Sequence, residues 1–179
     1  PAALISKNFE GLSYHTCISP SLDTTHYPDT NLDLSIAKHW KAMSSGGSTG
    51  RPKIIVDHQP AEVDPDEWFF DMPKNSCVLN PGPLYHNVPF TMSHHGLFRG
   101  NHIVGMSKFD ALESLRLVEK YRATWVMMVP TMMHRIWRLP ETVRESVDVS
   151  SLQVVSHVAS PMPVWLKEAW IGWLGEKRN

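Results

Sequence analysis

The stretch from Ser44 to Lys53 reads Ser-Ser-Gly-Gly-Ser-Thr-Gly-Arg-Pro-Lys, and it determines how the rest of the sequence is interpreted. Its three glycines let the backbone turn sharply and approach a ligand closely. Its four hydroxyl side chains add hydrogen-bond donors, and Arg51 and Lys53 add positive charge. Phosphate groups bind such combinations of backbone N–H groups, hydroxyls and cations. The stretch therefore predicts a phosphate-binding loop, although composition alone leaves open a solvent-exposed turn between two strands.

This loop does not fit the Walker pattern of nucleoside triphosphatases. In that pattern a lysine directly follows the last glycine, and a helix begins there. Here Arg51 and Pro52 stand between Gly50 and Lys53. The segment 53–57 reads Lys-Ile-Ile-Val-Asp, and its β-branched centre predicts a strand. Residues 36–43 are expected to enter the loop as another strand, so the loop is predicted to join two strands.

Strand and helix signals alternate along the rest of the chain. Short apolar runs predict strands at 77–80, 102–106, 124–129 and 153–158. Helical signals cover 90–98, 109–122, 131–138 and 163–174. This alternation predicts an α/β layered domain with a mostly parallel sheet. Residues 1–35 show no sustained periodicity, and we expect them to be mostly irregular with a short strand around 11–18.

Two of the predicted helices carry an apolar face. Asp110 is placed to cap the helix 109–122. The inner face of that helix is predicted to hold Leu112, Leu115, Val118 and Tyr121. The face of the last helix is predicted to hold Trp165, Ala169, Trp170, Trp173 and Leu174. The Met and Trp residues of the strand 124–129 are expected to be core residues, with an adaptable acyl pocket as the alternative.

Composition narrows the classes of function. The chain has 179 residues and a formal net charge of −1, which gives no reason to expect nucleic acid or an anionic membrane as a partner. No apolar run approaches the ~20 residues of a membrane span. Two unpaired cysteines and the lack of a signal peptide favour the cytoplasm. Ten histidines are present, but none shows metal-ligand spacing, so no metal site is predicted within the chain.

The glycine-rich loop resembles the phosphate loop of the adenylate-forming superfamily, which contains acyl-CoA synthetases, peptide-synthetase adenylation domains and luciferases. The family string is Ser/Thr-Ser-Gly-Ser/Thr-Thr-Gly-x-Pro-Lys-Gly. Gly46 stands where serine is usual, and Ile54 stands where the closing glycine is usual. The resemblance implies that the following residues bind the phosphates of ATP: Ser45, Gly46, Gly47, Ser48, Thr49, Gly50, Arg51 and Lys53.

Two downstream segments resemble the same family in the same order. The segment Pro83-Leu84-Tyr85-His86-Asn87 is similar to Pro-Leu/Met-Phe/Tyr-His, which places an aromatic or histidine residue beside the acyl substrate. The segment Val129-Pro130-Thr131 is similar to the turn Val-Pro-Thr/Pro at the start of a helix. The resemblance implies an acyl or CoA site formed by His86, Asn87, Phe90, Pro130 and Thr131. A plain core role is the alternative for His86.

A third segment matches more loosely. The sequence from His157 to Pro163 resembles Ser-Gly-Gly-Ala-Pro-Leu, which lies along the acyl pocket and the adenine. The resemblance implies that Val158, Ala159, Ser160 and Pro161 form a wall beside adenine and the acyl group. Val158 and Ala159 replace the usual glycines.

The exact residues of these motifs are similar to those of bacterial acyl-CoA synthetases related to bile-acid–CoA ligases. The resemblance implies that a carboxylic acid is activated with ATP and Mg²⁺ to an acyl-adenylate and then transferred to CoA. The acid is expected to be long-chain or bulky and polycyclic. Two alternatives remain open: an adenylation module that loads a carrier protein, and a non-catalytic nucleotide-binding module.

Several motifs of the family lie beyond this sequence. They include a Tyr-Gly-x-Thr-Glu motif that contacts the AMP phosphate and magnesium, and a small C-terminal domain with the catalytic lysine. We therefore expect residues 1–179 to be part of the large N-terminal adenylation domain and to be inactive alone. The catalytic lysine is not assigned to any residue here, and a homodimer is left open.

Overall fold

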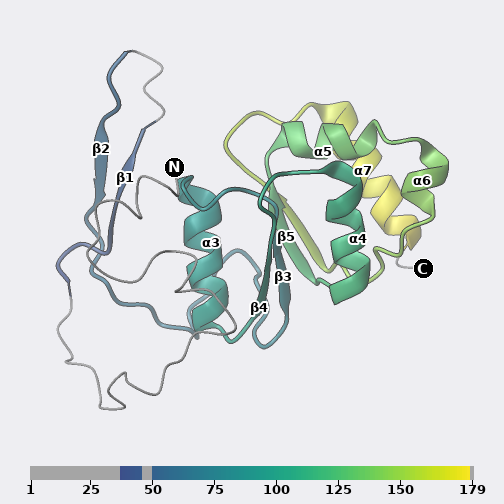
Figure 1. The fold of residues 1–179 in the computed structure, drawn as a ribbon. Coiled ribbons are helices and arrows are strands. Elements are labelled where there is room, and N and C mark those ends of the chain that lie inside the picture. The colour runs from purple at the N-terminus through teal and green to yellow at the C-terminus, as the bar shows by residue number, and fades with distance from the viewer. Residues whose placement is uncertain (1–36, 46–49, 178–179) are drawn as a thin grey trace. The chain divides into compact units, whose positions relative to one another are not determined.

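The structure is a computed structural model that describes residues 37–45 and 50–177 (Figure 1). The chain divides into two units, Pro1–Ser35 and Ile36–Asn179, and the description below concerns the second unit. The strand expected around 11–18 lies outside the described residues, as do residues 46–49 of the glycine-rich loop.

The glycine-rich loop joins two antiparallel strands. Strand β1 (Lys41–Ser44) pairs with strand β2 (Ile54–Asp57), with Lys41 opposite Asp57 and Ser44 opposite Ile54. The expectation of a strand on each side of the loop is confirmed. The first strand is shorter than expected, because residues 37–40 are not in a strand.

The second sheet contains four parallel strands. They are β3 (Cys77–Asn80), β4 (His102–Gly105), β5 (Trp125–Met128) and β6 (Val154–His157), in the order β4-β3-β5-β6. The helices are α3 (Asn87–Phe98), α4 (Ala111–Tyr121), α5 (Pro130–Trp137), α6 (Glu141–Glu145) and α7 (Val164–Lys177). The predicted α/β class with a mostly parallel sheet is confirmed. Helix α6 was not predicted, because five residues are too few to show a helical period.

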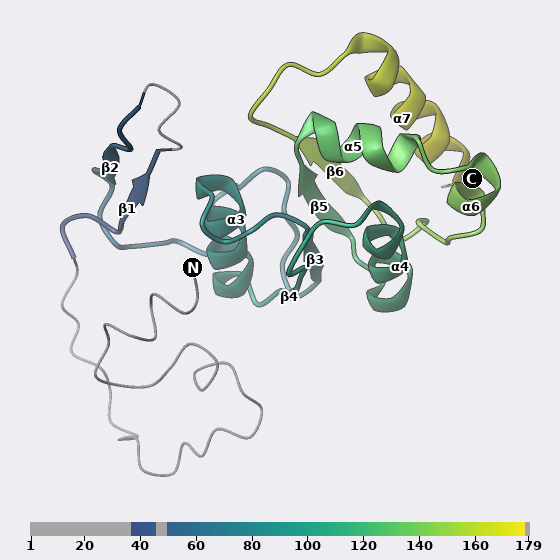
Figure 2. The ribbon, with the colours of Figure 1, turned by 45° about the horizontal axis from the view of Figure 1, so that its top comes forward.

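The two faces of this sheet carry separate apolar cores. On one face, α4, α5 and α7 pack through Leu115, Ile136 and Leu166, each no more than 2% exposed. On the other face, Met92 of α3 packs with Met72 and Met127. Figures 1 and 2 show α3 on one side of the strands and α4 on the other. The parallel sheet is therefore covered on both faces, as parallel sheets require.

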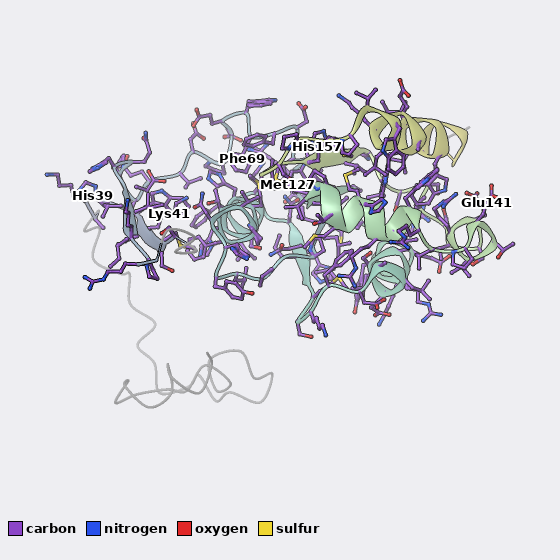
Figure 3. The ribbon with its side chains drawn as sticks, turned by 90° about the horizontal axis from the view of Figure 1, so that it is seen from above. His39, Lys41, Phe69, Met127, Glu141 and His157 are labelled. Atoms are coloured by element: carbon purple, nitrogen blue, oxygen red, sulfur yellow. The ribbon has the colours of Figure 1, made fainter. Side chains whose placement is uncertain are left out.

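Strand β5 passes through both cores. Its four residues, Trp125 to Met128, are all buried, so the expectation that they are core residues is confirmed. The indole Nε1 of Trp125 donates to the carbonyl oxygen of Phe70 at 2.9 Å, which satisfies the one polar group of this buried side chain. Met127 and the partly buried Phe69 belong to the same cluster (Figure 3).

Helix α4 begins as predicted and buries a slightly different face. The Asp110 carboxylate accepts a hydrogen bond from the backbone N–H of Glu113 at 2.9 Å. Leu115 and Val118 are buried as expected, whereas the prediction for Tyr121 is wrong, since its side chain is 37% exposed. Ser114 is buried instead, because its hydroxyl donates to the carbonyl oxygen of Ala111 at 2.8 Å and so loses no hydrogen bond.

Helix α7 also turns a different face inward than predicted. Trp170 and Trp173 are buried, as expected. Trp165 is 51% exposed and Leu166 is 1% exposed, so the expectation for Trp165 is wrong. The helix also continues beyond Leu174 to Lys177. A helix with apolar residues around most of its circumference does not indicate from sequence which side faces the core.

Ala159, two residues after β6, has a left-handed backbone conformation with a φ of 73°. A left-handed conformation costs an alanine about 1–2 kcal/mol because the Cβ approaches the following carbonyl oxygen. Glycine avoids this clash. The glycine that the related motif usually has in this region therefore agrees with the backbone observed here.

We predict that Ala159→Gly stabilises the fold by about 0.5–1 kcal/mol, since relief of the clash exceeds the entropy that glycine adds to the unfolded chain. Urea unfolding of the two proteins measures the difference. Ala61→Gly, at an exposed position without a positive φ, is the matched control and is expected to lose stability slightly. Equal or lower stability of Ala159→Gly would contradict the prediction.

Candidate adenylation site

The order of the strands places a topological switch point between β3 and β5. From β3 the chain crosses to β4 on one side, and from β4 it crosses back to β5 on the other side of β3. In open α/β sheets, ligands bind beyond the carboxyl ends of the strands at such a switch point. The segments that leave these ends are residues 81–86 after β3, 129–131 after β5 and 158–163 after β6. These contain the three segments that the sequence analysis related to an acyl and adenine site.

The segment after β3 forms a turn and then begins α3. The backbone N–H of His86 donates to the carbonyl oxygen of Pro83 at 3.0 Å, and that of Phe90 donates to the carbonyl oxygen of His86 at 3.1 Å. His86 is the N-cap residue of α3, and its side chain makes no capping hydrogen bond. Its exposed imidazole packs against the ring of Tyr85, with 4.7 Å between the ring centres. The imidazole nitrogens are thus not used to cap the helix.

Two other predicted residues of this segment lie on the first turns of α3. Asn87 is exposed, and its Oδ1 is 3.5 Å from the Thr91 hydroxyl. Phe90 is partly buried, and its ring lies 4.0 Å from that of His94. His86 is exposed, so the alternative of a plain core role does not hold, and its place in an acyl or CoA site stays a prediction.

The segment after β5 begins α5. Val129 is the N-cap residue, and Pro130 occupies the first turn, where a missing N–H costs least. Pro130 is buried, whereas Thr131 is exposed. Thr131 can therefore present a hydroxyl to a ligand, while Pro130 contributes to the fold of the edge.

The segment after β6 is joined to the same edge by the backbone. The N–H of Val158 donates to the carbonyl oxygen of Met128 at 3.2 Å. Val158 packs against the core on the α3 side, while Ala159, Ser160 and Pro161 are exposed. These three residues are accessible, as residues that line a ligand site must be.

His157 ends β6 and is labelled in Figure 3. Its Nδ1 is buried and has no hydrogen-bond partner among the described residues. Together with Met162, Lys167 and Ile171 it lines a small cavity of about 110 Å³. This cavity lies between β6, α5 and α7, and it is too small for more than a few water molecules.

The base of the glycine-rich loop is described on both sides. The backbone N–H of Ser45 donates to the carbonyl oxygen of Lys53 at 2.7 Å, and the N–H of Lys53 donates to the Ser45 hydroxyl at 2.9 Å. The Ser45 hydroxyl still has its own hydrogen to donate. Gly50 has a φ of 113°, which a residue with a side chain rarely adopts. Arg51 and Lys53 are exposed, whereas Gly46, Gly47, Ser48 and Thr49 lie outside the described residues.

Lys41 was not identified from the sequence. Its side chain is only 9% exposed, and its Nζ lies 3.3 Å from Asp57 Oδ2 and 2.8 Å from the Thr91 hydroxyl (Figure 3). The Nζ also lies 4.0 Å from the centre of the Trp40 ring. The pKa of Asp57 is lowered mainly by a hydrogen bond from the backbone of Gln59. A hydrogen bond from the Trp40 side chain and the nearby Lys41 lower it further. Lys41 thus links the strand that enters the loop to α3.

A larger cavity lies beside Lys41 and has a volume of about 560 Å³. Its walls include Trp40, Glu67, His94 and Phe98, and none of the predicted site residues lines it. His95 also faces it and stacks on Phe69 with 3.7 Å between ring centres. Burial, followed by the charge of Lys41, lowers the pKa of His95, so this imidazole is neutral near neutral pH.

Among the described residues, no group of three or more His, Cys, Asp or Glu side chains is placed to hold a metal ion. No helix in this part of the chain is both long and apolar enough to cross a membrane. Cys77 is a free thiol, and burial raises its pKa, which keeps it protonated and weakly nucleophilic.

Comparison with known proteins identifies relatives of this chain. It is 32% identical over 166 residues to the medium/long-chain-fatty-acid–CoA ligase FadD8 of Mycobacterium tuberculosis, an alignment that covers 87% of this chain and 28% of that protein. It is 24% identical over 155 residues to a long-chain-fatty-acid–CoA ligase of Bacillus subtilis, covering 83% of this chain and 25% of the relative. The chain thus spans little more than a quarter of the length of these relatives.

Solved structures share the fold. The inhibitor-bound N-terminal domain of FACL13 from Mycobacterium tuberculosis superposes with a TM-score of 0.64 at 23% identity, covering 74% of this chain and 33% of that one. A fatty acyl CoA synthetase of the same organism superposes with a TM-score of 0.62 at 22% identity, covering 74% of this chain and 26% of that one. The family model described as AMP-binding enzyme matches residues 42–178. The chain therefore belongs to the family of AMP-binding enzymes.

Proposed function

We propose that the protein containing this chain is an acid–CoA ligase that forms AMP. In the first half-reaction, a carboxylate oxygen attacks the α-phosphorus of ATP, and pyrophosphate leaves. In the second, the thiol of CoA attacks the carbonyl carbon of the acyl-adenylate, and AMP leaves. Family membership and the names of the relatives support this proposal.

The observation that carries the proposal is the convergence of three segments at one edge of the parallel sheet. His86 follows β3, Thr131 follows β5, and Ala159 follows β6, and all three are exposed. The carboxyl edge at a switch point is where open α/β sheets bind ligands. We propose that the acid and the adenine lie along this edge, between Asn87, Phe90 and Thr131 on one side and Ala159, Ser160 and Pro161 on the other.

The glycine-rich loop would hold the β- and γ-phosphates. A carboxylate that approaches a polyanion needs charge neutralisation and positioning, and both come from fixed donors and cations. In this proposal the hydroxyl of Ser45 donates to a phosphate oxygen while its lone pair keeps the N–H of Lys53 in place. Arg51 and Lys53 add two exposed positive charges at the same end of the hairpin. In the same proposal, residues 46–49 also contact the phosphates.

The choice of acid is the narrower part of the proposal. The two relatives are named for medium- and long-chain fatty acids. The residues of the sequence motifs resemble those of ligases related to bile-acid–CoA ligases, which favours a bulky polycyclic acid. Both classes are apolar and larger than acetate, so the proposed substrate is a large apolar carboxylic acid. A carrier protein in place of CoA is the alternative acceptor.

We further propose that residues 1–179 are part of the large N-terminal adenylation domain. Magnesium would then be held outside this chain, by the Tyr-Gly-x-Thr-Glu motif that the resemblance implies for the whole enzyme. The lysine that assists adenylation would also come from outside this chain. A cytoplasmic location and a homodimer remain predictions of the same proposal.

The test is carboxylate-dependent exchange of labelled pyrophosphate into ATP by the full-length protein. The acids to compare are palmitate, benzoate and a bile acid. We expect exchange with at least one of the large apolar acids, and formation of a CoA thioester with the same acid. Absence of exchange with every acid would contradict the enzymatic proposal, and thioester formation only on a carrier protein would favour the alternative acceptor.

We predict that Gly47→Val lowers this exchange by at least about a hundredfold, because a side chain prevents close approach of the backbone to phosphate. His86→Ala is expected to keep exchange and to raise the KM for the acid about fivefold. The control is Gly172→Val in α7, where an added Cβ meets no atom within 4 Å. Exchange by Gly47→Val at the rate of this control would contradict the role of the loop.

A further inference from the structure

Asn80, at the carboxyl end of β3, is a buried polar residue that the sequence analysis did not identify. Asn80 is only 7% exposed to solvent. Its Oδ1 accepts a hydrogen bond from the N–H of Gly82 at 3.2 Å. Its Nδ2 donates to the Ser93 hydroxyl at 2.8 Å and to the carbonyl oxygen of Pro89 at 3.3 Å. Both amide hydrogens and the amide oxygen are therefore in use.

These partners also fix the orientation of the amide. If its oxygen and nitrogen were exchanged, the NH₂ group would face the N–H of Gly82, and the oxygen would face the carbonyl of Pro89. A donor would then face a donor, and an acceptor would face an acceptor, in a buried place. Each lost hydrogen bond would cost about 1–3 kcal/mol. The Asn80 side chain is consequently held in one position.

The contacts of Asn80 connect the beginning and the end of the segment that carries His86. Gly82 lies in the turn directly after β3, whereas Pro89 and Ser93 lie on α3. The turn is packed directly against the helix, since a Cβ added at Gly82 would lie 2.5 Å from Cγ of Pro89. Residues 82–89, which comprise the turn after β3 and the first residues of α3, thus form a short segment whose two ends are held together by one amide, and His86 lies within that segment.

We propose that Asn80 is a positioning residue for the acid site, which acts by fixing the segment 82–89 and with it the imidazole of His86. The inference rests on the proposed function of His86 at the acyl site. Asn80 itself is buried, and its amide oxygen and both amide hydrogens are bonded to groups of the protein. It therefore acts through His86 and not by contact with the acid.

Asn101 provides a matched control at the opposite edge of the sheet. It precedes β4, is 5% exposed, and makes the same kind of contacts. Its Oδ1 accepts from the N–H of Ser76 at 2.8 Å, and its Nδ2 donates to the carbonyl oxygen of Pro73 at 2.7 Å. Asn101→Ala therefore removes a comparable buried amide from the amino edge of the sheet, where no predicted site residue lies.

The first measurement is hydrogen–deuterium exchange of the full-length protein, read from peptides that cover residues 81–90. Asn80→Ala is expected to raise exchange in these peptides by about tenfold or more, since the segment loses its anchor. Asn101→Ala is expected to leave them unchanged. Ser93→Ala serves if Asn80→Ala does not fold, because it removes one acceptor of the Asn80 amide and leaves the bonds to Gly82 and Pro89, so a smaller increase is expected. Unchanged hydrogen exchange in Asn80→Ala, or in Ser93→Ala where Asn80→Ala does not fold, would overturn the anchoring of this segment.

The second measurement separates positioning from general stability by the kinetics of pyrophosphate exchange. Asn80→Ala should raise the KM for the acid about three- to fivefold, no more than His86→Ala does, and change the KM for ATP less than about twofold. Asn101→Ala should change neither constant. In the His86→Ala background, Asn80→Ala should add less than about a twofold effect, because the group that it positions is already gone.

These outcomes distinguish the inference from the proposed function. If the unmodified protein shows no pyrophosphate exchange with any acid, the proposed function is removed, and with it the role of Asn80 at an acid site. If the unmodified protein shows pyrophosphate exchange but the KM for the acid is unchanged in Asn80→Ala, only the inference about Asn80 is overturned. Equal increases in the KM for acid in Asn80→Ala and Asn101→Ala would assign Asn80 a merely structural role and would also overturn it.

Discussion

The parallel pairing of β3 with β5 is the interaction on which the rest of the described structure depends. Val78 lies opposite Trp125, and Leu79 lies opposite Val126. All four side chains are no more than 2% exposed, and along each strand they alternate between the two apolar cores. A shift of the register by one residue would move each side chain to the other face, so two separate cores fix this pairing. Because the pairing also defines the switch point, the packing of the cores places the candidate site.

Two polar side chains, Asn80 and Lys41, connect distant parts of the chain to helix α3. Asn80 joins the turn after β3 to α3, and Lys41 joins the hairpin to Thr91 of the same helix. Helix α3 is thus contacted both from strand β3, which precedes residues 81–86, and from strand β1, which enters the glycine-rich loop. A buried amide and a buried ammonium are each costly without partners, so these contacts favour one arrangement over others.

The sequence predicted the elements whose signals are local. Apolar runs indicated the four parallel strands, Asp110 indicated the start of α4, and the glycine-rich loop indicated a hairpin. It could not predict α6, which has five residues, or the inward side of α7, where tryptophans occupy several faces. It missed Asn80 and Lys41 because their partners lie 13 and 50 residues away in sequence. The site was predicted as separate motifs, and only the strand order brings His86, Thr131 and Ala159 to one edge.

The proposed binding of the carboxylic acid at the carboxyl edge of the parallel sheet can be tested on the whole protein. Photo-crosslinking of the full-length protein with a diazirine-labelled fatty acid, followed by peptide mapping, tests it most directly. The account predicts that labelled peptides cover residues 81–90, 129–133 or 157–163, and that excess unlabelled acid suppresses the labelling. Labelling confined to α6 or to the amino edge of the sheet around Asn101, and suppressed by the same competitor, would contradict it.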